Sequence, residues 1–108
     1  MSKPRIELDK ELRSILQKCG FDKTHVYFQP PSHTQIKYPC IIYHLSIEED
    51  VVANNNLYLA NRKYDVTVID KNPDSYIPVE LRSHFQKCSM SRVYTADNLN
   101  HTAFVLYY

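Results

Sequence analysis

Apolar residues near the N-terminus recur at helical spacing and predict the first helix. They follow steps of three and four and share one stripe: Leu8, Leu12, Ile15, Leu16 and Cys19. Charged and polar residues fill the positions between them, as on the wet face of an amphipathic helix. Pro4 suits a helix start, and Gly20 suits the left-handed position just after a helix end. The pattern therefore predicts a helix from about Arg5 to Cys19.

Three later stretches predict strands. Val26–Phe28 is short and is closed by Pro30, which has no N–H donor for a strand ladder. Cys40–Ile47 alternates, so that odd-numbered and even-numbered positions face opposite sides. Arg62–Asp70 alternates in the same way, with valines and tyrosine on one face. Each stretch has the length of an ordinary strand.

The C-terminal part predicts a turn, a helix and a hairpin. Lys71–Asp74 reads KNPD, a strong turn signal, and Pro78–Lys87 follows as a helix that tolerates proline in its first turn. Met90–Thr95 and Thr102–Tyr108 predict the two arms of a β-hairpin, joined by a connection over Ala96–His101. The second arm is nearly all apolar or aromatic, so we expect both of its faces to be covered, or one face to meet a partner.

These elements predict an α+β domain over residues 1–108, in the order α-β-β-β-α-β-β, with a mostly antiparallel sheet and two helices packed on one face. Between Glu48 and Ala60 the apolar residues follow neither helical nor strand spacing. Asn54–Asn56 suits the tip of a long loop, since asparagine tolerates turn conformations. The apolar residues Leu57, Tyr58 and Leu59 come next; either they pack back on the core or they await a partner.

The composition of the chain limits the classes of function to be considered. The chain has 108 residues and a formal net charge of +1, so charge alone implies no attraction to nucleic acid or to a membrane. A single glycine excludes Gly-rich phosphate loops, and nine tyrosines suit strands and protein interfaces equally. Three cysteines without close spacing argue against a disulfide framework. We expect a protein made in a cytoplasm, without a membrane span or signal peptide.

Candidate chemistry is sparse. The five histidines lack the spacing that sets two ligands on one helix face: His25, His33, His44, His84 and His101. A hydrolase using Cys40 or Cys88 with a histidine remains an alternative, although neither cysteine opens a predicted helix. Asp70, Asp74 and Asp97 lie at turns, which short carboxylates close by bonding nearby backbone. We expect no catalytic residue, no metal and no cofactor.

A nucleic-acid-binding module is a second alternative. Binding on a sheet needs exposed aromatic side chains among basic ones. Tyr64 and Tyr94 lie close in sequence to Arg62, Lys63 and Arg92. The sequence therefore offers the residue types, whereas the low net charge argues against a strong electrostatic footprint.

The C-terminal half resembles a known family. The segments are YDVTVIDKNPDSYIPVELRSHF and SRVYTADNLNHTAFVLYY, with the likeness centred on the strand, turn and helix of Val66–Leu81 and on the turn Tyr94–His101. They resemble the tail terminator, or tail-completion, proteins of long-tailed bacteriophages, which are small minor tail proteins. The N-terminal half is similar only in the order of its elements.

The resemblance implies a structural virion protein of the tail or neck, assembled in the host cytoplasm. Such proteins form a ring, usually hexameric, that ends growth of the tail tube. One face would meet the tube protein and the other the head-completion or connector protein, while genome DNA passes through the lumen without specific binding. A head-side adaptor or stopper is a close variant. We expect subunit or partner contacts at Leu57, Tyr58, Leu59, Tyr94, Asn98, Tyr107 and Tyr108.

Overall fold

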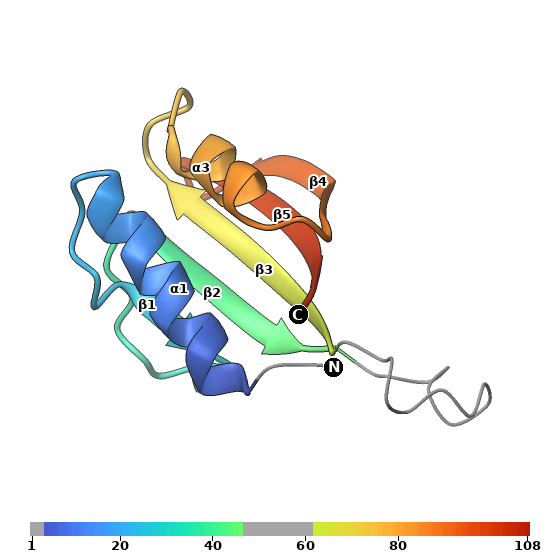
Figure 1. The fold of residues 1–108 in the computed structure, drawn as a ribbon. Coiled ribbons are helices and arrows are strands. Elements are labelled where there is room, and N and C mark those ends of the chain that lie inside the picture. The colour runs from blue at the N-terminus through green and yellow to red at the C-terminus, as the bar shows by residue number, and fades with distance from the viewer. Residues whose placement is uncertain (1–3, 47–61) are drawn as a thin grey trace.

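In the part of the chain that the structure describes, five strands form one mixed sheet and two helices lie on one of its faces (Figure 1). The structure is a computed structural model that describes residues 4–46 and 62–108. Its elements, in chain order, are α1 (Arg5–Lys18), β1 (Val26–Phe28), β2 (Cys40–Leu45), β3 (Lys63–Asp70), α3 (Ile77–His84), β4 (Cys88–Ala96) and β5 (Leu99–Tyr107). The predicted α+β class and element order are confirmed. The expected loop tip at Asn54–Asn56 and the apolar residues Leu57–Leu59 lie outside the described residues.

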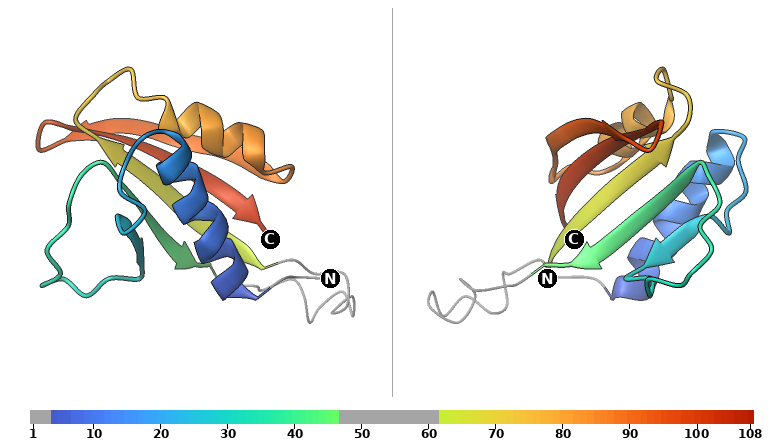
Figure 2. Two further views of the ribbon diagram at one scale, coloured as in Figure 1. Left: turned by 60° about the vertical axis from the view of Figure 1, so that its left-hand side comes forward. Right: turned by 180° about the vertical axis from the view of Figure 1, so that it is seen from behind.

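The sheet order is β1-β2-β3-β5-β4, so β1 and β4 are the edge strands. Only β1 and β2 run parallel; the other neighbours are antiparallel, as predicted. Helix α1 crosses the β1–β2 side of the sheet and α3 the β4–β5 side (Figures 1 and 2). The two helices of residues 4–46 and 62–108 thus lie in one layer, and neither of them covers the far side of the sheet.

The core lies between the helices and the sheet. Leu8, Leu12 and Leu16 of α1 are fully buried, as the predicted stripe requires. They face alternate strand residues, and the largest of these that are fully buried are Ile41, Tyr43, Tyr64, Val66, Phe104 and Leu106. Burying one leucine side chain stabilises the fold by about 1.5–3 kcal/mol. The alternation of apolar positions therefore decides which sheet face the helices cover.

Gly20 ends α1 in the manner the sequence predicts. Its φ is +89°, in the left-handed region where a side chain is unfavourable. The Gly20 N–H donates to the carbonyl of Gln17 at 3.0 Å, and the Phe21 N–H donates to the carbonyl of Leu16 at 3.0 Å. This pair of bonds is a Schellman motif, which satisfies carbonyls that the helix end would otherwise leave unpaired.

Helix α3 is shorter than predicted. It begins at Ile77 and ends at His84, whereas the sequence predicted a helix over Pro78–Lys87. Phe85 already has extended backbone, with φ −104° and ψ 138°. Its buried ring meets the ring of Tyr108 edge-on, with centroids 6.0 Å apart. This packing outweighs the helix propensity of the two residues that follow Phe85.

The predicted connection of the C-terminal hairpin is wrong. In place of a loop over Ala96–His101, a two-residue turn at Asp97 and Asn98 joins β4 directly to β5. Asp97 has φ +53° and Asn98 has φ +62°, as a type I′ turn requires. Both strands are therefore longer than predicted. A register shift between Met90 and Arg92 marks a β-bulge in β4.

The turn gives a direct test of the fold. Asn98→Val should lower the free energy of unfolding by about 1–2 kcal/mol, because a β-branched residue is strained at positive φ. Asn98→Gly should leave that free energy unchanged or raise it slightly, since glycine favours this position. Urea denaturation followed by circular dichroism measures both. Equal stability of the two variants would contradict the type I′ turn.

Candidate functional site

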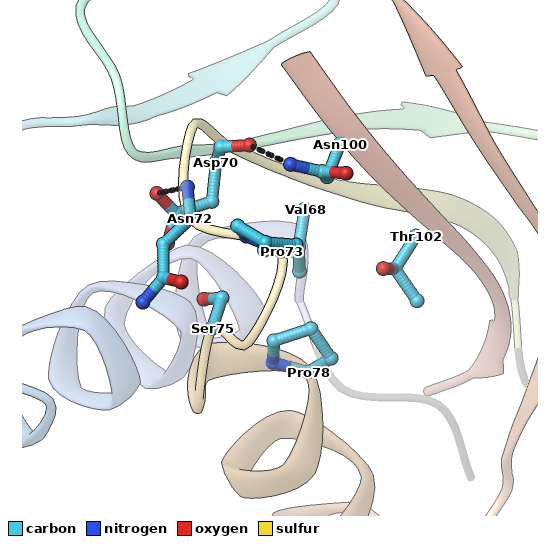
Figure 3. Close-up of a pocket in the computed structure, with 8 residues that line it drawn as sticks. All are labelled: Val68, Asp70, Asn72, Pro73, Ser75, Pro78, Asn100 and Thr102. Atoms are coloured by element: carbon cyan, nitrogen blue, oxygen red, sulfur yellow. Dashed lines mark hydrogen bonds between the residues drawn. The ribbon is translucent and has the colours of Figure 1, made fainter. Parts of the chain in front are cut away.

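The small cavity beside the β3–α3 turn is a structural site (Figure 3). Its volume is about 30 Å³, which admits one or two water molecules but no substrate. The Asp70 carboxylate accepts a hydrogen bond from the Asn72 N–H at 3.1 Å, and the Asn100 side chain donates to the Asp70 carbonyl at 3.3 Å. Asp70 therefore closes the turn, as the sequence predicted. The residues that line the cavity are Val68, Asp70, Asn72, Pro73, Ser75, Pro78, Asn100 and Thr102.

The cysteines lie in surroundings that disfavour the thiolate. Burial raises the pKa of Cys40 to about 12, and the nearby Asp70 charge adds to the effect. Burial also raises the pKa of Cys88 and, together with Glu80, the pKa of Cys19. A nucleophilic cysteine reacts as the thiolate, so these sites lack the electropositive environment that such a residue needs. The geometry gives no support to the cysteine hydrolase alternative.

The histidines serve separate local contacts. His25 Nδ1 lies 3.0 Å from the carbonyl oxygen of Pro39, and His101 Nδ1 lies 3.2 Å from that of Leu99. A carbonyl oxygen only accepts, so each Nδ1 carries the proton in these contacts. Within residues 4–46 and 62–108, no three His, Cys, Asp or Glu side chains come together in a group that could hold a metal ion.

Two tyrosine hydroxyls hold α1 to the sheet. The first belongs to Tyr43 on β2, whose ring is fully buried. Its hydroxyl donates to Asp9 at 2.5 Å and accepts from the Arg5 guanidinium at 2.9 Å. Arg13 also donates to Asp9, at 2.5 Å. Burial raises the pKa of Tyr43, and the hydrogen bond to Asp9 raises it further.

The second anchor is Tyr108, which the sequence analysis named among the residues expected to contact a subunit or partner. The structure places its side chain in the chain's own core, 8% exposed. Its hydroxyl donates to Glu11 on α1. His84 Nε2 lies 2.7 Å from the other oxygen of the same carboxylate. Burial, reinforced by Glu11, raises the pKa of Tyr108.

The face of the sheet away from the helices carries an ordered group of polar and aromatic side chains. Tyr94 on β4 and His101 on β5 are register partners. Their rings stack at 4.6 Å and 14°, and the Arg92 guanidinium carbon lies 4.6 Å from the centre of the Tyr94 ring. We call Arg92, Tyr94 and His101 the aromatic column. Sequence reasoning named Arg92 and Tyr94 but missed His101, because the register that joins it to Tyr94 depends on the turn.

The same face continues along β5 towards its C-terminal end. Positions of equal parity along a strand share a face, so Ala103, Val105 and Tyr107 follow His101. Tyr107 is 45% exposed and pairs in register with Lys63 on β3. We call this uncovered side, from the aromatic column to Tyr107 and Lys63, the open face; in Figure 2 it is the side of the sheet opposite the helices.

Tyr64 lies elsewhere than the nucleic-acid alternative requires. Its side chain is fully buried between the sheet and the helices. Tyr64 alternates with Lys63 and Asp65 along β3, so it faces the core and they face the open side. Only Tyr94, of the two tyrosines named for that alternative, is on the exposed surface.

Large apolar side chains are exposed near both edges of the sheet. On the β4 side, Tyr76 and Val79 of α3 are 64% and 51% exposed, and Met90 and Val93 of β4 are 49% and 64% exposed. Near the β1–β2 side, the exposed group includes Ile6 at the start of α1 and Leu45 at the end of β2. We call these groups the β4-edge patch and the β2-edge patch.

The predicted interface residues are thus only partly brought together. Tyr94, Asn98 and Tyr107 are exposed, and all three belong to the β4–β5 hairpin. Tyr108 is buried, and Leu57–Leu59 lie outside the described residues. Whether the exposed three contact another subunit stays a prediction.

Comparison with known proteins assigns this chain to no family. No protein-family model matches the sequence, and no curated protein sequence matches it. Among the helices of the described residues, none is both long and apolar enough to cross a bilayer.

The tyrosine anchors predict a response to alkaline pH. Because the pKa values of Tyr43 and Tyr108 are raised in the folded state, the unfolded chain loses these protons first. The contribution of these two tyrosines to the free energy of unfolding should be fully present below about pH 10. Above that pH it should fall, by up to about 1.4 kcal/mol per pH unit for each tyrosine. Tyr43→Phe or Tyr108→Phe should flatten this fall in urea titrations, whereas Tyr76→Phe should not.

The thiols predict an order of chemical modification. Cys19 is partly exposed, Cys88 is buried but 9% exposed, and Cys40 is fully buried with the most strongly raised pKa. Iodoacetamide at mildly alkaline pH should therefore alkylate Cys19 first and Cys40 only when the chain unfolds. Peptide mass mapping at successive times measures the order. Rapid alkylation of native Cys40 would reopen the question of a reactive thiol.

Proposed function

We propose that this chain is a structural assembly protein of the tail-terminator kind. Its copies form a ring, hexameric by the resemblance, that caps the head-proximal end of a phage tail tube and docks the tail to the head connector. The ring acts without a cofactor, and genome DNA passes through its lumen. The observation that carries the proposal is the presence of two separate groups of exposed apolar side chains, one on α3 and the edge strand β4 and the other at the start of α1 and the end of β2.

A ring needs two different contact surfaces on each copy. In a head-to-tail contact one patch meets a different patch of the next copy, and repetition with rotation closes a ring. The β4-edge patch presents Met90 and Val93, and the β2-edge patch presents Ile6 and Leu45. Exposed apolar side chains near both edges suit such contacts. An isologous dimer would need only one of the patches.

The edge strand β4 strengthens this argument. Edge strands of monomeric proteins are often protected by lysine and other charged side chains, by proline or by a β-bulge. Cys88–Ala96 contains a bulge and Arg92, but no lysine, acid or proline. Its side chains are exposed over most of its length. A strand of this composition, with Val93 in the open, gains stability when a neighbouring subunit covers it.

The resemblance supplies the biological setting. The strand, turn and helix around Val66–Leu81 and the turn within Tyr94–His101 resemble tail terminators, and a sheet backed by helices is the layout that the resemblance implies. A head-side adaptor or stopper of the neck would use the same kind of ring. Position in the virion separates these two roles.

Self-assembly tests the proposal. Val93→Asp places a charge in the β4-edge patch and Ile6→Asp does so in the β2-edge patch, so each should abolish the ring, alone or on tail tubes of the same phage. Each variant keeps one intact patch. Mixing the two should therefore yield heterodimers and nothing larger. Light scattering and native mass spectrometry measure the mass, and electron microscopy locates the protein on the tube.

Gln86→Asp is the matched control, because Gln86 is an exposed polar residue just beyond α3 and lies outside both patches. It should assemble as the unaltered chain does. A protein that remains monomeric both free and with tubes, or variants whose mixture forms no heterodimer, would contradict head-to-tail assembly.

A further inference from the structure

We infer that the open face of the sheet binds a short stretch of single-stranded nucleic acid, with the aromatic column as its principal contact. The inference stands apart from the proposed ring, because it uses the face of the sheet and the ring uses its two edges. The aromatic column is the first observation that supports it. Arg92 and His101 both lie 4.6 Å from the ring of Tyr94, so the three groups are already ordered without a ligand. A preorganised site avoids much of the entropy cost of binding.

The chemistry of the column matches a nucleotide. Bases stack on aromatic rings and on arginine guanidinium planes, and a guanidinium donates to phosphate oxygens. The column offers both kinds of plane, and a base that stacks against its outer surface would extend it. Among residues 4–46 and 62–108, no carboxylate forms an ion pair with Arg92. Its charge can therefore meet a phosphate without breaking an ion pair within the described part of the chain.

A second aromatic and cationic pair lies at the other end of the open face. Tyr107 is exposed and is the register partner of Lys63, which likewise forms no ion pair with the described carboxylates. Tyr107 lies six positions after His101 on β5, which is about 20 Å at the usual strand rise. That length suits about four nucleotides, at the lower end of known single-strand site sizes.

The side chains in the middle of the open face are short enough for a single nucleic-acid strand to lie along it. Ala103 and Val105 of β5 lie between the two ends, and Thr67 pairs with Ala103 on the neighbouring strand β3. These are small or medium side chains, all only partly exposed. Asp65 is the one acid on this face of β3, and His44 lies opposite it in register. The balance of charge along the track therefore favours a polyanion.

A fluorescein-labelled oligothymidylate of about 12 nucleotides tests the site, by fluorescence anisotropy with the purified full-length chain. We expect binding that weakens between about 50 and about 200 mM salt. Tyr94→Ala should weaken it at least about fivefold, as loss of one stacked base does, whereas Tyr94→Phe should retain it. Arg92→Ala should reduce the slope of log affinity against log salt by about 0.7.

Tyr76→Ala is the matched control, since Tyr76 is the most exposed tyrosine of the described chain but lies on the helix side. It should bind as the unaltered chain does. If Tyr94→Ala fails to fold by circular dichroism, Tyr107→Ala tests the other end and should also weaken binding. A duplex of the same length should bind more weakly than the single strand.

Several results would overturn the inference. Absence of salt-dependent binding by the unaltered chain is one. Equal weakening by Tyr76→Ala and Tyr94→Ala, or equal affinity for duplex and single strand that Tyr94→Ala leaves unchanged, would reduce the contact to nonspecific charge. If Tyr94→Ala instead dissociates an oligomer that excludes the oligonucleotide, the open face belongs to a second copy. Val93→Asp separates the two proposals, because it should abolish the ring and leave oligonucleotide binding intact.

Discussion

The seating of α1 on the sheet is the contact on which the rest of the structure depends. The apolar stripe of α1 supplies most of its burial, and two hydroxyl bonds fix its position, from Tyr43 to Asp9 and from Tyr108 to Glu11. These tyrosines come from β2 and from the residue just after β5, on either side of β3. One helix thus ties strands that are distant in sequence, and by covering one face it leaves the other face open.

The buried tyrosines show how burial outweighs an imperfect polar contact. Tyr64 is fully buried, and among the described residues its hydroxyl has no hydrogen-bond partner. An unpaired buried hydroxyl costs about 1–3 kcal/mol. A buried tyrosine ring removes about 150–250 Å² from water, which at about 25 cal/mol per Å² stabilises by roughly 4–6 kcal/mol. The ring of Tyr64 also lies 6.1 Å from that of Tyr43. Area therefore decides the balance at Tyr64, whereas Tyr43 gains both area and hydrogen bonds.

The helical stripe and the alternation of strands were sufficient to predict the fold class, because both depend on local periodicity. The hairpin register was not predicted, because it depends on two residues with positive φ, Asp97 and Asn98. Once that turn is known, Ala96 pairs with Leu99, and counting two residues further along each strand reaches Tyr94 and His101. The aromatic column could therefore have been found from the turn. The bulge after Met90 could not, since nothing in the local sequence requires it.

The division between edges and face explains how one small domain could hold two kinds of contact. On the side of the sheet away from the helices, Tyr94 and Tyr107 of the β4–β5 hairpin are exposed, whereas Cys40 and Ile69 on the same face are buried. The proposed assembly contacts would bury Val93 on one side and Ile6 on the other, and neither residue belongs to the aromatic column. Assembly through the edges would therefore leave Tyr94 and Tyr107 exposed. Arg92 and Val93 are neighbours on β4 and point to opposite faces of the sheet. The proposed subunit contact and the proposed nucleic-acid contact therefore come closest on this strand. A charge at Val93 should disturb the subunit contact alone, because it leaves the aromatic column unaltered.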